Sequence, residues 1–406
     1  MQDSPAHRYR YKVVLVANMT WNIWNYRKPV IEALQKAGFQ VVVVAPVDDA
    51  LPKLLKDTQV EFIPLEDFRR NSTRIWGTLR MVYEFVRIYR AIKPDLIVHF
   101  GVQANILGNL SAWFVGASSV CVVTGLGYTF LHHNVLHTLV KWLYRLSFRV
   151  AKLVVFENEP DRALMVSTGS VAAEKTRVVS GCGIDVEAFQ PRRRNRSNRR
   201  VVFSYFGRLL YDKGLREFYE AACMVRLTFP NTEFRIFGTL DKSNPAHIRP
   251  SELLHWVKNG TIRYRGVVDD VRPYMAESDV VVLPSYREGL SRTLLEGMAM
   301  ARPLVVTDVP GCRETVDHAV NGLLVPPRDA PSLAEAMMHC CALTDQERAT
   351  MGWAGRRKVV SAFSSDLVGA QYLHMVSDVL KITPRGLPKT HHADGHTSLP
   401  FPEYAA

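Results

Sequence analysis

Two glutamates, Glu288 and Glu296, lie eight residues apart in the stretch EGLSRTLLE. The preceding segment DVVVLPS (279–285) predicts a buried strand, YREGLS predicts the loop at its carboxyl end, and SRTLLEGMAMA predicts the helix that follows. Glu296, in the helix, can accept hydrogen bonds from the vicinal hydroxyls of a ribose. Glu288, in the loop, can accept them from a second sugar. Together they predict a nucleotide-sugar site, although two solvated acids near a helix start would show the same spacing.

The start of this helix is also suited to an anion. Ser291 is placed to cap it, which leaves free amides between Leu290 and Thr293, next to Gly289. A helix amino terminus with such amides favours a diphosphate. The loop and the helix start therefore predict one site for the two ends of a nucleotide-sugar.

A second turn, FGRLLYDKG (206–214), follows another predicted strand and contributes two cations, Arg208 and Lys213. Gly207 and Gly214 in this turn allow a close backbone approach. Fixed cations stabilise the negative charge that develops on a departing diphosphate, so they can take the place of a metal ion. The chain contains no Asp-x-Asp sequence, and we expect neither a metal nor a cofactor. Taken alone, this turn would also fit a surface loop.

Segments of strand and helix character alternate along the chain, which predicts an α/β fold of two doubly wound domains. The basic stretch PRRRNRSNRR interrupts this pattern and predicts a linker. We expect the first domain over residues 1–190, the linker over 191–200 and the second domain over 201–363. A further helix over 364–380 and a disordered tail over 381–406 follow.

Composition narrows the class of protein further. Of the 406 residues 47% are hydrophobic, no apolar run is long enough to span a bilayer, and the start of the chain lacks a signal peptide, so we expect a cytoplasmic protein. Six dispersed cysteines predict reduced thiols. Residues 1–195 contain 25 Lys and Arg against 16 Asp and Glu, so the first half is suited to an anionic partner.

The motifs of the second half resemble the retaining glycosyltransferases of family 4 (group 1), which have the GT-B fold. The resemblance rests on GRLLYDKG, on EGLSRTLLE and on the segment EGMAMARPLVVTDVPGCRETVDHAVNGLLVPPRD that follows. In the first half, TGLGYTF (124–130), FENEPD (156–161) and SGCGIDVEAF (180–189) are similar to the PglA-type N-acetylgalactosaminyltransferases, which add sugars to polyprenyl-diphosphate-linked acceptors.

This resemblance implies two Rossmann-like domains with a cleft between them, a nucleotide-sugar-binding second domain that holds the UDP-sugar and an acceptor-binding first domain. It also implies that the helix over 364–380 returns to the first domain. Arg208 and Lys213 would bind the diphosphate and act in catalysis with Glu288, which contacts the donor sugar, while Glu296 binds the ribose. The remaining donor contacts that the resemblance implies are Gly207, Gly289, Leu290, Ser291 and, in the base-contacting loop RGVVDD, Val268.

The acceptor side is less well defined. Related sequences have a Thr-x-Lys-Pro-Asn-like segment where this chain has GVQAN, so that only Asn105 is shared. We assign His99, Asn105, Thr124 and Gly125 to the acceptor side, although a histidine at a strand end is more often a structural residue.

Two basic amphipathic segments, 72–93 and 135–152, mix Arg and Lys with aromatic residues and predict contact with an anionic membrane. No nucleic-acid recognition motif is present, and we expect no nucleic-acid partner. The predicted partners are therefore a UDP-sugar, a lipid-linked saccharide and the inner face of a membrane.

The function that we expect is transfer of a hexose or N-acetylhexosamine from a UDP-sugar, with retention, to a polyprenyl-diphosphate-linked saccharide during surface-glycan synthesis. A UDP-sugar 2-epimerase-like isomerase has a similar two-domain architecture and is one alternative. A non-catalytic protein that binds sugar nucleotides or lipids is the other.

Overall fold

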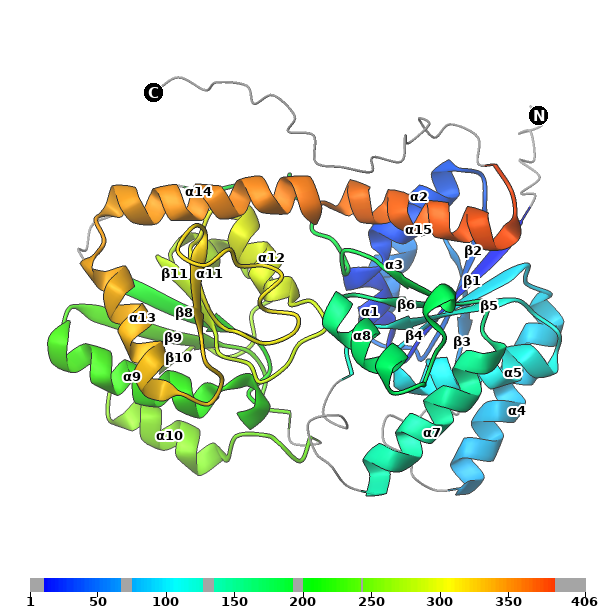
Figure 1. The fold of residues 1–406 in the computed structure, drawn as a ribbon, viewed down its shortest axis with the longest axis horizontal. Helices are drawn as coiled ribbons and strands as arrows, with labels where there is room; N and C mark the ends of the chain where they lie inside the picture. Colours follow the sequence, from blue (N-terminus) through cyan, green and yellow to red (C-terminus); the bar gives the residue numbers. More distant parts are fainter. Residues whose placement is uncertain (1–10, 67–74, 127–134, 193–199, 242–243, 384–406) are drawn as a thin grey trace.

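The computed structural model describes residues 11–66, 75–126, 135–192, 200–241 and 244–383. These residues form two parallel sheets, each with helices on both faces (Figure 1). The prediction of two doubly wound α/β domains is confirmed. None of the helices within these ranges is long and apolar enough to cross a bilayer.

The first sheet has seven parallel strands in the order β3-β2-β1-β4-β5-β6-β7. Its strands are β1 (Lys12–Ala17), β2 (Gln40–Ala45), β3 (Glu61–Pro64), β4 (Leu96–Phe100), β5 (Ser119–Val123), β6 (Leu153–Phe156) and β7 (Thr176–Val178). The helices between them are α1 (Thr20–Tyr26), α2 (Lys28–Lys36), α3 (Leu51–Thr58), α4 (Ile75–Ile92), the π-helix η1 (Ala104–Gly108), α5 (Asn109–Phe114), α7 (Val135–Val150), α8 (Glu159–Ser167) and the 3-10 helix η2 (Ala173–Lys175).

The second sheet has six parallel strands in the order β10-β9-β8-β11-β12-β13. Its strands are β8 (Val201–Phe206), β9 (Thr232–Phe237), β10 (Ile262–Tyr264), β11 (Val280–Leu283), β12 (Leu304–Thr307) and β13 (Gly322–Val325). The helices are the 3-10 helix η3 (Tyr211–Lys213), α9 (Leu215–Thr228), α10 (Pro250–Lys258), α11 (Arg272–Ala276), α12 (Arg292–Ala299), α13 (Ala330–Ala342), α14 (Asp345–Ala362) and α15 (Ser365–Leu380).

Both sheets reverse their strand order at one point, between β1 and β4 and between β8 and β11. The central strands are apolar on both faces because helices cover each face. In β1, for example, Val13 and Leu15 join one core while Val14 and Val16 join the core on the other side. Ligands of such sheets bind beyond the carboxyl ends of the strands at the reversal, which positions the candidate site.

Two helices run nearly end to end across the molecule, α14 over the second domain and α15 over the first (Figure 1). Thr344 and Glu347 form a capping box at the start of α14, and Ser364 caps α15. Tyr372 and Val376 of α15 are buried in the core that contains β1. The last helix of the described residues, α15, therefore fastens the end of the second domain to the first.

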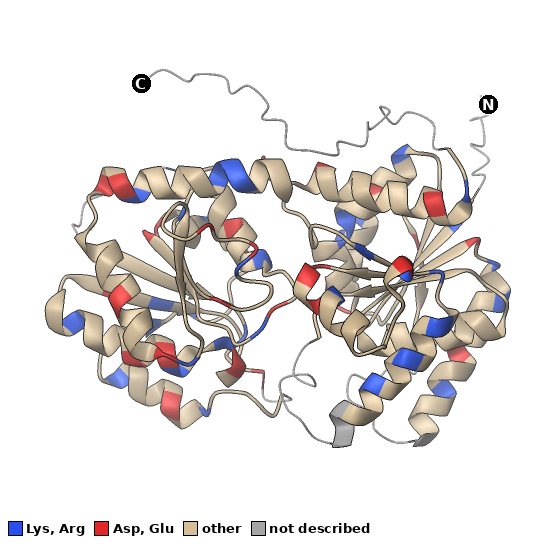
Figure 2. Ribbon diagram, in the orientation of Figure 1, with Lys and Arg blue, Asp and Glu red and all other residues tan. Residues whose placement is uncertain are grey.

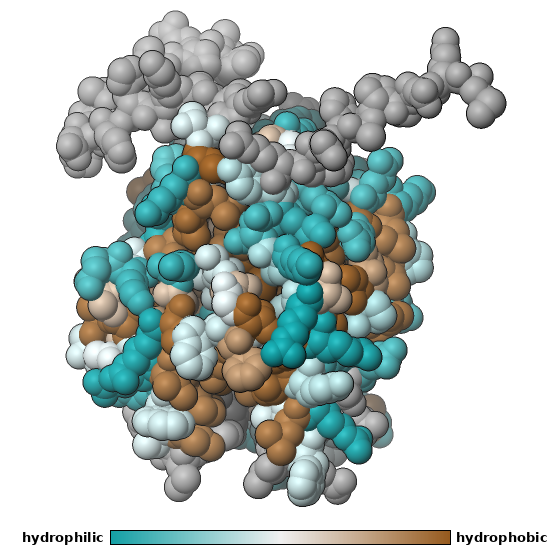
Figure 3. Space-filling model, turned by 90° about the vertical axis from the view of Figure 1, so that its right-hand side faces the viewer, coloured by the Kyte–Doolittle hydropathy of each residue, from teal (hydrophilic) through white to brown (hydrophobic). Residues whose placement is uncertain are grey.

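One face of the first domain exposes aromatic side chains among cations. Trp76 and Tyr83 on α4, Trp113 on α5 and Trp142 on α7 are all at least half exposed. Lys and Arg residues follow α4 and α7 along their length (Figure 2), and hydrophobic residues lie between hydrophilic ones on the side of the first domain that Figure 3 shows. The one acidic residue of the two helices, Glu84, is buried.

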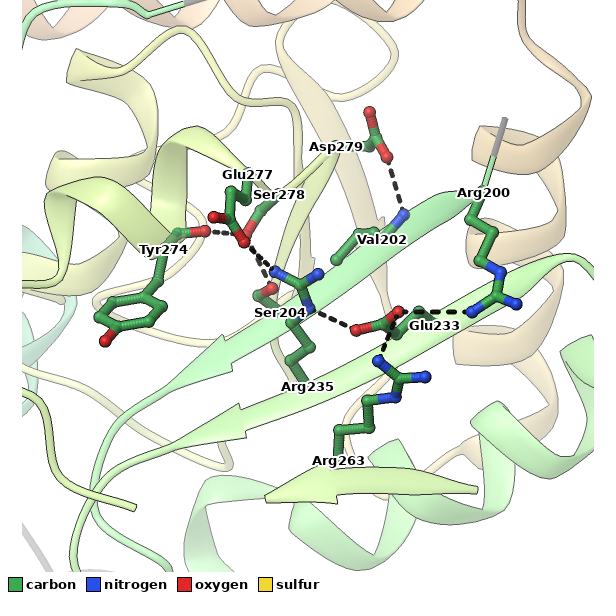
Figure 4. A network of polar contacts seen from close by, with 10 residues as sticks. All are labelled: Arg200, Val202, Ser204, Glu233, Arg235, Arg263, Tyr274, Glu277, Ser278 and Asp279. Atoms are coloured by element: carbon green, nitrogen blue, oxygen red, sulfur yellow. Dashed lines mark hydrogen bonds and ion pairs between the residues drawn. The ribbon is translucent and has the colours of Figure 1, made fainter. Parts of the chain in front are cut away.

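A polar network stabilises the amino-terminal edge of the second sheet, away from the candidate site (Figure 4). Glu233 of β9 is mostly buried and is surrounded by three arginines, with Oε atoms 2.6 Å from Arg235, 3.3 Å from Arg263 and 3.9 Å from Arg200. Asp279 accepts a hydrogen bond from the amide of Val202 at 2.8 Å. These contacts hold β8, β9 and β10 together, so the carboxyl ends keep a fixed arrangement.

Candidate active site

Two turns meet at the carboxyl ends of β8 and β11, the adjacent strands at the order reversal of the second sheet. The amide of Tyr286 donates to the carbonyl of Asp212 at 2.9 Å, which links the two turns. Gly214 has a φ of +69°, and a Cβ there would lie 2.0 Å from the carbonyl oxygen of Pro284. Glycine is therefore required for the two turns to approach this closely.

Lys213 and Glu288 form an ion pair where these turns meet. The Ser285 hydroxyl donates to the same Glu288 oxygen at 2.6 Å, and the Thr307 hydroxyl donates to the carbonyl of Ser285. Both charged side chains are largely buried, with 19% and 12% exposed. An ammonium group has three donors, so Lys213 can hold Glu288 and still donate to a phosphate.

Arg208, the other predicted cation, points toward solvent. Its guanidinium lies 3.6 Å from Asp241, and its side chain is 45% exposed. The Tyr205 hydroxyl donates to the backbone carbonyl of Arg208 at 2.8 Å, and the amide of Gly207 donates to the carbonyl of Phe237 at 2.9 Å. The turn after β8 is thus held by its backbone, which leaves the Arg208 side chain able to reach an anion.

Glu296 of α12 is largely buried, with 12% of its side chain exposed, and pairs with Arg292, one helical turn earlier, at 2.9 Å. Burial raises the pKa of the Glu296 carboxyl, and the Arg292 charge opposes this rise. Arg292 also donates to the backbone carbonyl of Asn25 in the first domain and lies over the Tyr26 ring, 5.5 Å from its centre. Glu296, which is predicted to bind the ribose, therefore lies beside a direct contact between the two domains.

The loop before α12 is fixed mainly by its backbone. Ser291 occupies the N-cap position, but its side chain makes no capping hydrogen bond. The amides of Glu288 and Ser291 donate to Pro310 and Gly311 at 3.0 and 3.3 Å, so these two are already engaged. Leu290 is buried, and Val268 of the RGVVDD loop packs half-buried on the second-domain core.

The four residues assigned to the acceptor side divide into two pairs. Thr124 and Gly125 touch the loop before α12, where a Cβ on Gly289 would lie 2.1 Å from the carbonyl oxygen of Thr124. His99 and Asn105 are fully buried in the first domain. His99 Nε2 lies 3.0 Å from the Tyr89 hydroxyl, and the Asn105 side chain donates to the carbonyl of Val122 at 2.8 Å. We therefore leave this buried pair out of the proposed site.

Three polar residues next to the predicted ones were not identified from the sequence. Arg287 precedes Glu288 and forms an ion pair with Asp161 of the first domain. Asn158 donates to the carbonyl of Gly289 at 2.6 Å. Asn158 and Asp161 belong to the FENEPD segment, which carried part of the resemblance. The sequence did not indicate that Asp161 pairs with Arg287, 126 residues away. Within the described ranges, no group of three or more His, Cys, Asp and Glu side chains is arranged to hold a metal ion.

Comparisons with known proteins agree with this architecture. The model of group 1 glycosyl transferases matches residues 200–342, and that of the glycosyl transferase 4-like domain matches residues 23–182. Anabaena HepE, crystallised with UDP-glucose, has a TM-score of 0.76 at 18% identity, covering 91% of this chain and all of its own. Sucrose-phosphate synthase of Thermosynechococcus elongatus has a TM-score of 0.74 at 19% identity, covering 92% of this chain and all of its own.

Two of the curated relatives that span most of the chain are named for related reactions. One is the N,N'-diacetylbacillosaminyl-diphospho-undecaprenol alpha-1,3-N-acetylgalactosaminyltransferase of Campylobacter jejuni, 26% identical over 89% of this chain and 96% of its own length. The other is the UDP-Gal:alpha-D-GlcNAc-diphosphoundecaprenol alpha-1,3-galactosyltransferase of Escherichia coli, 23% identical over 86% and 95%.

The two parallel sheets and the family matches define a GT-B glycosyltransferase, and the chain is therefore an enzyme. Together the two family models match most of the chain. The chain belongs to the group 1 glycosyltransferases of family 4.

Proposed function

We propose that this enzyme transfers a hexose or N-acetylhexosamine from a UDP-sugar to a saccharide carried on polyprenyl diphosphate. The observation that carries the proposal is the Lys213–Glu288 pair at the carboxyl ends of β8 and β11, where a ligand of such a sheet binds. The two curated relatives are named for transfer to diphospho-undecaprenol-linked sugars, which supports this class of acceptor. The names UDP-Gal and UDP-glucose among the relatives support a UDP-sugar donor.

In the proposed reaction, the bond between the anomeric carbon and the β-phosphate oxygen breaks and negative charge develops on UDP. Lys213 and Arg208 stabilise that charge, and Glu288 accepts hydrogen bonds from the donor sugar. Glu296 accepts the ribose hydroxyls. An acceptor hydroxyl attacks the face that UDP leaves, which retains the anomeric configuration, and its proton passes to the departing phosphate.

We further propose that the first domain lies on the cytoplasmic face of a membrane. The exposed aromatic residues of α4, α5 and α7 have amphipathic rings that suit the head-group region, and the neighbouring arginines suit anionic phosphates. A lipid-linked acceptor would then reach the enzyme from the surface on which it is docked. Together these partners indicate a step in the assembly of a surface polysaccharide or glycan.

Calorimetry with UDP-hexoses and UDP-N-acetylhexosamines, followed by turnover on short polyprenyl-diphosphate sugars, tests the transfer. Loss of one charge-assisted contact in Lys213→Ala or Glu296→Ala weakens UDP binding about 10- to 100-fold. Glu288→Ala chiefly lowers kcat, because its contact is with the reacting sugar. Lys358→Ala is the matched control, since Lys358 is also ion-paired, to Asp317, but lies on α14.

Wild-type kinetics in Lys213→Ala, Glu288→Ala and Glu296→Ala would reject the site. Conversion of the UDP-sugar into another UDP-sugar without an acceptor would favour the epimerase alternative. Binding of the donor with no turnover on any acceptor would favour the non-catalytic one.

A further inference from the structure

The first domain holds the loop between β11 and α12, called here the donor loop, on both sides of Glu288. On one side, the guanidinium of Arg287 pairs with the carboxylate of Asp161, whose side chain is 1% exposed. On the other side, the carbonyl of Gly289 accepts a hydrogen bond from Asn158 at 2.6 Å. The residues before and after the proposed donor carboxylate are therefore both bound by the start of α8, one by its first turn and the other by its N-cap residue.

Asn158 and Asp161 form a rigid unit. The Asn158 side-chain oxygen accepts from the amide of Asp161 at 2.7 Å and so caps α8, while its side-chain nitrogen lies 3.2 Å from the Asp161 carboxylate. Burial raises the pKa of Asp161, and the Arg287 charge opposes this rise. A carboxylate so deeply buried depends on its cation, because removal of one partner leaves a charge without compensation.

Backbone contacts fix the same loop at this point. Gly125 and Gly289 approach so closely that a Cβ on Gly125 would lie 2.9 Å from the Gly289 Cα. This contact and the two polar ones all cross between the domains. Separation of the domains would break all three together and leave the loop held only by contacts within the second domain, such as those of the Glu288 and Ser291 amides.

Resting on the proposed function, we infer that Asp161 and Asn158 are positioning residues for sugar transfer. Contacts within the second domain already hold Glu288, and through Arg287 and Gly289 the two residues restrain the loop on either side of it while the domains are in contact. The leaving-group site is then most tightly ordered when the acceptor domain is in place. Such coupling favours transfer to the acceptor over hydrolysis of the donor by water, because an open enzyme holds a less ordered site.

Two variants test this inference, Asp161→Asn and Arg287→Gln, each of which removes one charge and keeps a similar shape. Glu159→Gln is the matched control, because Glu159 lies on the same helix but pairs with Arg162 at its surface. We expect both variants to lower kcat about 10- to 100-fold, the loss typical of a slightly displaced catalytic group, while the Kd for UDP changes less than about threefold. The ratio of donor hydrolysis to transfer should rise, and Arg287→Lys should restore part of kcat.

A double-mutant cycle and small-angle scattering complete the test. If the two residues act as one contact, the double variant is no slower than either single variant. Scattering needs no substrate and so remains informative even if no sugar transfer is found. We expect a larger radius of gyration in both single variants than in the wild type, and no change in Glu159→Gln. If Asp161→Asn fails to fold, the measurements on Arg287→Gln alone test the inference.

An unchanged radius of gyration, or an unchanged kcat where transfer is measured, would overturn the inference, as would additive losses in the double variant. Absence of transfer by the wild-type enzyme, together with the expected scattering, would reject the proposed function and leave the interdomain contact intact.

Discussion

The side chain of His99 lies in the core of the first domain, next to the hydroxyl of Tyr89. Burial lowers the pKa of His99 to about 3, whereas an unfolded histidine has a pKa near 6.5. Below about pH 6.5 the unfolded chain takes up a proton that the folded chain excludes. The stability that His99 contributes at neutral pH is therefore lost progressively as the pH falls from about 6.5 toward 3.

We predict that His99→Gln reduces this acid sensitivity. Denaturant unfolding of the first domain, measured from pH 7.5 to 5, should show that the wild-type free energy of unfolding falls more steeply, by up to about 1.4 kcal/mol per pH unit. Sugar transfer should persist, because His99 lies outside the proposed site. The exposed His255 provides the control as His255→Gln. Equal slopes in wild type and His99→Gln, or loss of transfer, would contradict this assignment.

Single residues differ in how far the sequence defines them. Lys213 and Glu288 each follow an apolar strand, and parallel strands end at one edge, so their proximity could be predicted. The end of a strand suggested His99 and the resemblance suggested Asn105, yet both side chains are fully buried. A strand buried on both faces gives no alternation that tells which side chain reaches the edge. Arg287 and Asp161 could not be paired, because their contact depends on how two domains meet.

The turn after β8 and the loop after β11 are elements whose contact depends on one glycine. Gly214→Ala would place a Cβ 2.0 Å from the carbonyl oxygen of Pro284 and would also strain a backbone at φ +69°. We predict a loss of about 1–3 kcal/mol in stability and weaker UDP binding, because the turn must move and take Lys213 away from Glu288.

Gly260→Ala is the matched control for this prediction, because Gly260 has a φ of +74° but nothing within 4 Å of the position that a Cβ would take. It therefore reports backbone strain alone. Thermal unfolding and calorimetry with UDP measure both effects. Equal UDP affinity in the two variants would show that the close approach is not needed for the site.

The helix α14 illustrates what the sequence leaves undetermined at the scale of an element. Its buried positions include Arg348, Gly352 and Gly355, so it lacks the apolar stripe that predicts a helix. It packs closely through small residues, and a Cβ on Gly352 would lie 2.1 Å from the carbonyl oxygen of Ala301. The capping box at Thr344 was the available signal. Strand β7 has three residues, none of them buried, and only its pairing with β6 defines it.

At the scale of the whole molecule, the alternation of strand and helix was enough to predict two doubly wound domains, because each sheet forms its own core. The resemblance implied that residues 364–380 return to the first domain, whereas the contacts at the donor loop required the structure. In the structure the relation between the domains rests on α15, whose apolar residues complete the first-domain core, and on those contacts. Such contacts follow from the packing of surfaces far apart in the sequence, which local patterns do not encode.

The exposed face of α4, α5 and α7 predicts how the whole molecule meets a membrane. Trp76 and Trp142 are both more than half exposed beside arginines, and interfacial binding combines apolar burial with attraction to anionic lipids. In flotation with vesicles containing phosphatidylglycerol, the variant with Trp76→Ser and Trp142→Ser should bind about tenfold more weakly than wild type. Binding by the wild type should fall in high salt and on phosphatidylcholine alone.

The control is Trp353→Ser, because Trp353 is also half exposed but lies on α14 of the second domain, and this variant should bind like wild type. Equal weakening by both kinds of variant would show a general effect of surface tryptophans, and wild-type binding without lipid preference would exclude an electrostatic contribution.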